Sequence, residues 1–208
     1  DEVNVFNRTL QPNEIKAHYL KGSNVLLPDE RVYANPWDYN NLLSLSDSVT
    51  FDSTTNYTLF DSNSDYLTPT NISSRKELVN SSFTLCYFFK RNNTNLDTSH
   101  IEKWGNSLDL RIISNDVRLT LTPTAPNTAQ SISTPINLVA DTEWHHVCAV
   151  RDKENEEIKI LLDGEKVVSS FFNNSWELQD FNEVVIGRDI IAGGSDEGFQ
   201  GILAQSFL

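Results

Sequence analysis

Short runs of alternating apolar and polar residues recur along the chain, and this pattern constrains the fold more than any other feature. Two pairs of such runs flank turn-forming residues, 108–112 with 117–121 and 158–162 with 166–168. Ser114-Asn115-Asp116 separates the first pair, and Asp163-Gly164 separates the second. Because side chains on a strand point alternately to its two faces, and because such turns close antiparallel strands, both pairs predict β-hairpins.

Further alternating or apolar runs predict four more strands, at 83–89, 144–150, 184–187 and 201–208. A glycine-rich stretch at 192–195 separates the last two. One short helix is predicted at 11–15, where Pro12 and Glu14 suit a first helical turn. Many short strands joined by regular turns are typical of an all-β sandwich, which is the fold class that we expect.

The charge of the chain excludes several classes of partner. The 208 residues carry a formal net charge of -13 at pH 7, with a sequence pI near 4.6. Such a surface repels phosphate backbones and anionic lipid headgroups, so we expect no nucleic acid partner. No run of about 18 apolar residues is present, so we expect no membrane insertion. The length suits one large domain with a sizeable core.

Asn-x-Ser/Thr acceptors for N-glycosylation are frequent in this chain. They stand at six positions, Asn7, Asn56, Asn71, Asn80, Asn92 and Asn173. A chain rich in Asn, Ser and Thr acquires some of these by chance, but six together favour a secreted or cell-surface protein.

The two cysteines, Cys86 and Cys148, each lie inside a predicted strand and could face one another across a ladder. The alternative is two buried free thiols, as in a cytosolic protein. The acceptors for glycosylation favour an oxidising compartment, where disulfides persist. A bridge would close a loop of about 60 residues and stabilise the fold by roughly 4 kcal/mol in the chain-entropy model.

Several motifs resemble those of one family. Residues 143–150, followed within one hairpin by 158–166, are similar to the signature of laminin-G-like and pentraxin domains. Residues 82–89 resemble an early strand of these domains, 60–67 their opening edge motif, and 185–187 the strand before their final loop. Together the matches extend from about residue 51 to the end of the chain.

The resemblance implies a concanavalin A-like antiparallel β-sandwich, or jelly roll, in residues 51–208. In pentraxins, cysteines at the positions of Cys86 and Cys148 are joined, so the resemblance independently supports this disulfide. The pentraxin pattern after the second cysteine expects a small hydroxyl residue and a tryptophan, whereas this chain has Val150 and Arg151. The chain therefore resembles the fold without matching pentraxins proper.

The two ends do not fit one simple copy of such a domain. Residues 1–22 resemble the closing strand and helix of laminin-G-like domains, yet they stand first, and 199–208 resemble the same closing strand. We interpret 23–50 as a connecting segment. Three explanations stay open: a fragment of a tandem array, a permuted domain whose first strand completes its own sheet, or a strand donated to another copy.

The first strand, with Val3, Val5 and Phe6, must pair with some sheet edge, because a lone strand is not stable in water. Donation of this strand to another copy of the chain would build a polymer. These three residues are therefore candidates for an assembly contact.

No catalytic constellation is predicted. His145 and His146 are adjacent on a strand, so their side chains face opposite sides and cannot converge on one ion or substrate. The Glu-x-Asp-x-x-Glu arrangement of related sandwich enzymes is absent from the sequence. The charged run 152–157 lies between two predicted strands, and we interpret it as a solvated hairpin tip.

Calcium is the one cofactor that the sequence suggests. Oxygen-rich loops with several carboxylates suit this hard cation, and many relatives of the fold bind it. Asp61 and Asp65 lie in a predicted edge segment, and Asp189 and Asp196 flank the glycine-rich loop. These four are candidate ligands.

The favoured hypothesis is a non-catalytic extracellular module for adhesion or structural assembly, such as a repeating subunit of a surface filament or layer joined by strand exchange. Its partners would be copies of itself. The rival hypotheses are a calcium-dependent lectin with glycan partners and an ancillary module of a larger secreted enzyme. Pairing of the first strand with its own sheet would favour the rivals.

Overall fold

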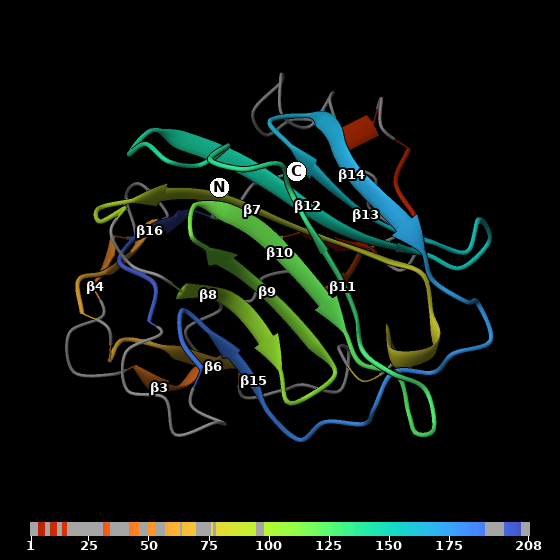
Figure 1. Ribbon diagram of the computed structural model, residues 1–208. Helices are drawn as coiled ribbons and strands as arrows, with labels where there is room; N and C mark the ends of the chain where they lie inside the picture. The colour runs from red at the N-terminus through yellow and green to blue at the C-terminus, as the bar shows by residue number, and fades with distance from the viewer. Residues whose placement is uncertain are drawn as a thin grey trace.

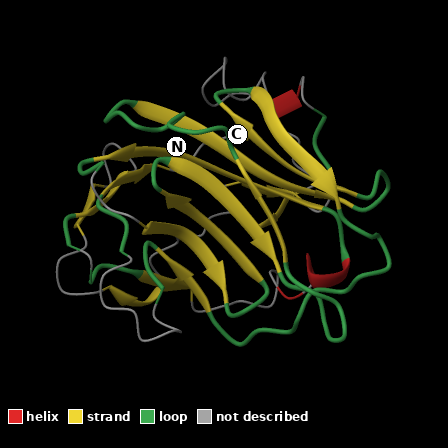
Figure 2. Ribbon diagram, in the orientation of Figure 1, coloured by secondary structure: helices red, strands yellow, loops and turns green. Residues whose placement is uncertain are grey.

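The alternating runs form antiparallel strands in two facing sheets, as the computed structural model of the chain shows (Figure 1). The structure describes residues 4–6, 9–11, 14–15, 31–33, 42–45, 50–52, 57–62, 64–69, 76, 78–94, 98–189 and 198–204. Strands dominate these residues and helical turns are short (Figure 2). The chain is an antiparallel β-sandwich of two sheets, as predicted.

The first sheet is centred on two long strands, β7 and β12. Its main path runs β14 (Glu165–Phe171), β13 (Glu157–Leu162), β12 (Trp144–Asp152), β7 (Phe83–Arg91), β16 (Gly201–Ala204), β5 (Tyr57–Phe60) and β4 (Thr50–Asp52). Two short strands complete it, β1 (Asn4–Phe6) and β2 (Arg31–Tyr33).

The second sheet contains the first predicted hairpin. Its order is β11 (Gln130–Ser133), β10 (Asp116–Leu121), β9 (Leu108–Ile113), β8 (Thr98–Trp104), β15 (Val184–Ile186), β6 (Leu67–Pro69) and β3 (Leu42–Leu45). A 3-10 helix, η3 (Leu78–Asn80), precedes β7.

Both predicted hairpins are confirmed, with two-residue turns. Ser114 and Asn115 join β9 to β10 with φ of 49° and 69°, and Asp163 and Gly164 join β13 to β14 with φ of 51° and 83°. Positive φ at both central residues matches the right-handed twist of the strands, and Asn, Asp and Gly tolerate it best.

The main core fills the space between the sheets with the inward apolar residues of both. One carboxylate, that of Glu102 on β8, is fully buried in this space. The hydroxyl of Tyr87 donates to its Oε2, and the Trp104 Nε1–H donates to its Oε1 at 2.5 Å. Two donors satisfy the carboxylate, which is the condition for burying such a group at tolerable cost.

A second, small cluster lies on the other face of the first sheet and includes the disulfide. Cys86 on β7 and Cys148 on β12 are directly opposite in register, with Cα atoms 4.2 Å apart, and they are bonded. Leu10 and Ile15 of the N-terminal segment pack there and are each 1% exposed. Val150 and Leu161 complete the cluster. The N-terminal segment therefore covers the disulfide.

The N-terminal segment follows the helical signal of its sequence. Glu14 Oε2 accepts the backbone N–H of Gln11 at 2.8 Å, and Gln11 O accepts the amides of Glu14 and Ile15 at 3.0 and 3.1 Å. This reciprocal arrangement resembles a capping box and begins the short predicted helix. The Leu10 N–H donates to Thr84 Oγ1 on β7 at 3.3 Å, which attaches the segment to the sheet.

The first strand pairs within its own chain. β1 pairs antiparallel with β7, with Asn4 opposite Cys86 and Phe6 opposite Thr84. β16 pairs with the same edge of β7 further along, from Gly201 opposite Arg91 to Ala204 opposite Phe88. This pairing is within one chain, and the choice among the tandem, permuted and donated-strand explanations for the chain ends stays a prediction. Val3 lies outside the described residues, so its part in assembly stays a prediction.

The interval 23–50, interpreted as a connecting segment, contains β2 and β3, and β4 begins at its end. β3 pairs with β6 and β2 with β1, so both are edge strands of three or four residues, too short to show a period. Of the predicted strand 201–208, the structure describes Gly201–Ala204.

Among the described residues, no helix is long and apolar enough to cross a bilayer.

Candidate binding site

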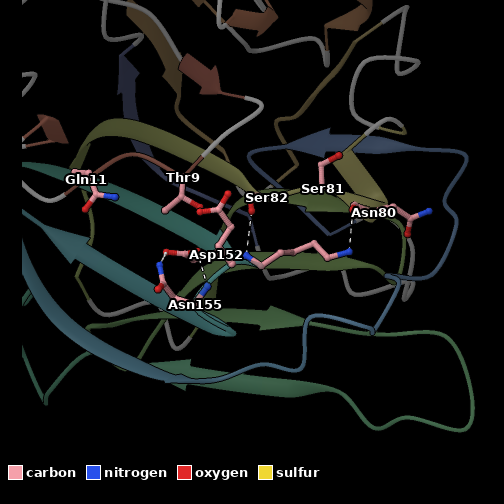
Figure 3. A pocket seen from close by; sticks show the side chains of 9 residues that line it. Thr9, Gln11, Asn80, Ser81, Ser82, Asp152 and Asn155 are labelled. Carbon is pink, nitrogen blue, oxygen red and sulfur yellow. Dashed lines mark hydrogen bonds between the residues drawn. The ribbon is translucent and has the colours of Figure 1, made fainter.

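A polar cavity of about 480 Å³ lies where the N-terminal segment, the residues before β7 and the β12–β13 hairpin meet (Figure 3). Its volume is within the usual range of ligand pockets. Nine residues line it, each with a hydrogen-bonding side chain: Thr9, Gln11, Asn80, Ser81, Ser82, Asp152, Lys153, Glu154 and Asn155.

Lys153 joins two walls of the cavity. Its Nζ donates to the carbonyl of Asn80 at 3.0 Å, and its backbone N–H donates to Ser82 Oγ at 3.0 Å (Figure 3). Burial lowers the pKa of Lys153, and the neighbouring Arg151 lowers it further. The hairpin tip and the residues before β7 are therefore held in one relative position.

Asp152 forms the buried end of the cavity and is 2% exposed. Its Oδ1 accepts the backbone N–H of Asn155 at 3.1 Å, and its Oδ2 accepts Asn155 Nδ2 at 2.9 Å and Lys159 Nζ at 3.1 Å. Burial opposes ionisation, but these hydrogen bonds and the Lys159 charge together lower the pKa of Asp152. The carboxylate is therefore ionised and fixed in orientation at neutral pH.

Arg151, the residue that replaces the pentraxin tryptophan, supports the cavity from within the fold. It is fully buried, and its Nη1 donates to the carbonyls of Val79 and Ser81 at 2.6 and 3.4 Å. Its Nη2 donates to the Trp176 carbonyl, and its guanidinium lies 5.4 Å from the Phe172 ring centroid. Burial lowers the pKa of Arg151 to about 10. Arg151 thus fixes the backbone before β7.

The lining of the cavity is suited to hydrogen bonding. Its described lining contains amides, hydroxyls, two carboxylates and one ammonium, but neither a histidine nor a cysteine. The described lining also lacks an aromatic ring on which a sugar could stack. The arrangement suits recognition of a ligand rich in hydroxyl groups.

The sequence did not identify this cavity. Residues 152–157 are predicted to form a solvated hairpin tip, and Glu154 is indeed exposed, but Asp152 is buried and ion-paired with Lys159. The other walls come from residues 9–11 and 80–82, which are far from the hairpin in the sequence. Since no spacing rule connects three such segments, only the fold could bring them together.

Three of the four candidate calcium ligands lie among the described residues, and there no group of three possible metal-ligating side chains includes any of them. Asp65 is fully buried, and its Oδ2 accepts the backbone N–H groups of Asp61 and Ser62 at 2.9 and 3.1 Å. Asp189 is 3% exposed and pairs with the Lys103 ammonium, whereas Asp61 is exposed. Asp196 lies outside the described residues. Protein donors thus hold Asp65 and Asp189, and a calcium site at these four residues stays a prediction.

Three of the glycosylation acceptors lie in the described part of the chain. Asn80 and Asn92 are exposed, and Asn173 is partly exposed. Asn173 Oδ1 accepts the N–H and the hydroxyl of Ser175 at 2.9 and 2.7 Å. The other three, Asn7, Asn56 and Asn71, lie outside the described residues, and occupancy of all six stays a prediction.

The two adjacent histidines diverge, as expected for neighbours on a strand. His146 lies near the disulfide, with Nε2 3.8 Å from Cys148 Sγ. His145 instead lies between two carboxylates, with Nδ1 2.9 Å from Asp163 Oδ2 and Nε2 3.0 Å from Asp141 Oδ1. We call Asp141, His145 and Asp163 the histidine clamp.

A laminin G family model, described as the concanavalin A-like lectin/glucanases superfamily, matches residues 61–206. The chain belongs to this superfamily. No curated protein sequence matches this superfamily member.

This superfamily member is similar to several solved structures at low sequence identity. The binding domain of botulinum neurotoxin DC, in complex with SialylT, is 15% identical, with a TM-score of 0.57 over 78% of this chain and 41% of the toxin domain. The Ruminococcus gnavus IT-sialidase CBM40, bound to alpha2,3 sialyllactose, is 20% identical (TM-score 0.47; 60% and 76% covered). Mouse laminin alpha1 LG4-5 is 15% identical (TM-score 0.44; 59% and 33%). The chain thus spans about two fifths of the toxin binding domain.

Proposed function

We propose that this chain is a non-catalytic extracellular module that binds a neutral, hydroxyl-rich carbohydrate in the polar cavity. The observation that carries the proposal is the lining, because every side chain in it can form hydrogen bonds and several are already held in place. A site whose polar groups are fixed before binding loses less conformational entropy when a ligand arrives.

The charges of the cavity favour a neutral sugar over an acidic one. Asp152 and Glu154 contribute two negative charges, and Lys153 contributes one positive charge that is directed to the Asn80 carbonyl. Because Lys159 pairs with Asp152 and Lys153 donates to the Asn80 carbonyl, a sugar carboxylate would lose its water here without gaining an ion pair, in a chain whose formal net charge is -13. Hydroxyl groups can donate to the carboxylates and accept from the amides without this penalty.

The fold and the covalent chemistry support an extracellular place for this function. The superfamily is named for lectins as well as glucanases, and the disulfide would persist in an oxidising compartment. Exposed glycosylation acceptors at Asn80 and Asn92 agree with secretion. The cavity carries this proposal, and assembly by strand donation stays a separate prediction beside the pairing of β1 with β7 within one chain.

The test is titration calorimetry against a panel of neutral and sialylated oligosaccharides. Gln11→Ala and Glu154→Ala each remove lining side chains from exposed positions, and Glu165→Ala on β14 is the control, because this exposed glutamate does not line the cavity. Loss of one hydrogen bond of about 0.5–1.5 kcal/mol weakens binding about 2- to 13-fold.

We expect a neutral oligosaccharide to bind the wild type and the control equally, and both cavity variants more weakly. If no neutral oligosaccharide binds at millimolar concentration, or if the cavity variants bind as the wild type does, the proposal is wrong. The titrations are repeated with a chelator and with added calcium. We expect the affinity of the cavity for the oligosaccharide to be the same in both.

A further inference from the structure

One glycosylation acceptor is part of the cavity wall. All three residues of the sequon Asn80-Ser81-Ser82 line the cavity, and Asn80 is exposed at the end of η3. The other described acceptors, Asn92 and Asn173, do not line it. A glycan on Asn80 would therefore begin at the cavity, whereas glycans on the other two would begin elsewhere.

The backbone and the side chain of Asn80 have different roles in this wall. Its carbonyl accepts Lys153 Nζ at 3.0 Å and so belongs to the hydrogen bonds that shape the cavity. Its side-chain amide extends away from Ser82 in Figure 3. Attachment of a sugar to this amide therefore leaves the bonds of the wall intact and places the sugar at the rim.

An N-linked glycan has the same chemistry as the ligand that we propose for the cavity. It is neutral near its attachment point and rich in hydroxyl and acetamido groups, which match the amide and carboxylate lining. Because it is tethered, its effective concentration at the cavity lies in the millimolar range, and this concentration does not fall on dilution of the protein.

We propose that a glycan on Asn80 occupies the mouth of the cavity, so that glycosylation at this one position determines whether the module binds an external sugar. This inference rests on the proposed binding function. If the effective concentration of the tethered glycan is about ten times its dissociation constant for the cavity, the apparent affinity for an external sugar falls about tenfold.

The experiment compares chains secreted from a eukaryotic host that glycosylates them. The variants are Asn80→Gln and two matched controls, Asn92→Gln and Asn173→Gln, each of which also loses one acceptor. Glycopeptide mass spectrometry measures occupancy at Asn80, and calorimetry measures binding of N,N′-diacetylchitobiose, which reproduces the first two sugars of the glycan. Wild-type chain produced in a bacterial periplasm, without N-glycosylation, provides the same comparison with no substitution.

We expect Asn80 to be occupied, and we expect Asn80→Gln and the periplasmic chain to bind the disaccharide about tenfold more tightly than the glycosylated wild type. The two controls should bind as the wild type does. An unoccupied Asn80, or equal affinity of Asn80→Gln and the wild type, overturns the inference while the binding function stands. If no form binds, including the unglycosylated one, the proposed function itself fails, and the inference with it.

Discussion

The histidine clamp makes the stability of the fold depend on pH in a direction that the structure determines. His145 is 9% exposed and lies at the start of β12, between Asp141 in the preceding loop and Asp163 in the β13–β14 turn. The hydrogen bond to Asp163 raises the pKa of His145, burial opposes this, and Asp141 adds to the rise. Both ring nitrogens face carboxylates, so the doubly protonated ring fits the clamp best.

The sign of the effect follows from linkage. Because the pKa of His145 is raised in the folded state, its contribution is complete below its ordinary value of 6.5 and is lost as the pH rises through the folded value. The pKa of Asp141 is lowered by the Glu143 amide and by His145. Burial raises the pKa of Asp163, but the hydrogen bonds from the His145 ring and the His146 amide, together with the charges of both histidines, lower it overall. Their contributions are lost only as the pH falls below about 3.8.

The size of the effect follows from exposure. The Asp163 side chain is 36% exposed, so its contact with His145 contributes about 1–2 kcal/mol. The Asp141 side chain is 56% exposed, so solvent screens its contact to about 0.2–1 kcal/mol. We expect His145→Gln to lower the free energy of unfolding by about 2 kcal/mol at pH 6 and by about half of that at pH 9.

Urea denaturation of the wild type and His145→Gln between pH 5.5 and 9 measures this difference. Asp141→Asn, alone and combined with His145→Gln, isolates the more exposed contact by a double-mutant cycle. A stability difference that does not change across this pH range would refute the reasoning, because neutral and charged His145 would then be equally stable in the clamp.

Three further substitutions have effects that the structure predicts. Replacement of both Cys86 and Cys148 by Ala releases a loop with a sequence separation of 62 and should lower the free energy of unfolding by about 4 kcal/mol, measured by urea denaturation; no loss would contradict the chain-entropy account. Glu102→Gln leaves one of two buried donors without a carboxylate oxygen and should cost about 1–3 kcal/mol, seen as a lower Tm. Gly187→Ala, at φ 91° and with its Cβ 2.3 Å from a Phe60 ring carbon, should cost about 2–4 kcal/mol, and wild-type stability would exclude this clash.

The sequence predicted those parts of the fold in which one local pattern suffices. The two hairpins have clear alternation and turn residues that accept positive φ, so their register could be inferred without tertiary information. β8 was not predicted. It turns the charged Glu102 into the core, which breaks the alternation on which strand prediction depends.

The candidate site was harder to predict than the fold. The sequence analysis predicts Asp189 as a metal ligand because it flanks the glycine-rich loop. Its partner Lys103 is 86 residues away in the sequence, and only pairing of β15 with β8 brings the two side chains together. Asp152 was interpreted as part of a solvated run because its neighbours are charged. Its burial depends on Lys159, which lies beyond the turn of the same hairpin.

β1 and β16 pair along the same edge of β7, and this arrangement suits circular permutation of the domain. Ala204, at the end of β16, lies opposite Phe88, and Asn4, at the start of β1, lies opposite Cys86. The two chain segments run in the same direction along one partner strand and are about 7 Å apart at their meeting point. Replacement of residues 205–208 and 1–3 by a single residue opposite Tyr87 could therefore make one continuous strand, and new termini opened at the Asp163-Gly164 turn would give a circular permutant that retains the described strand pairings.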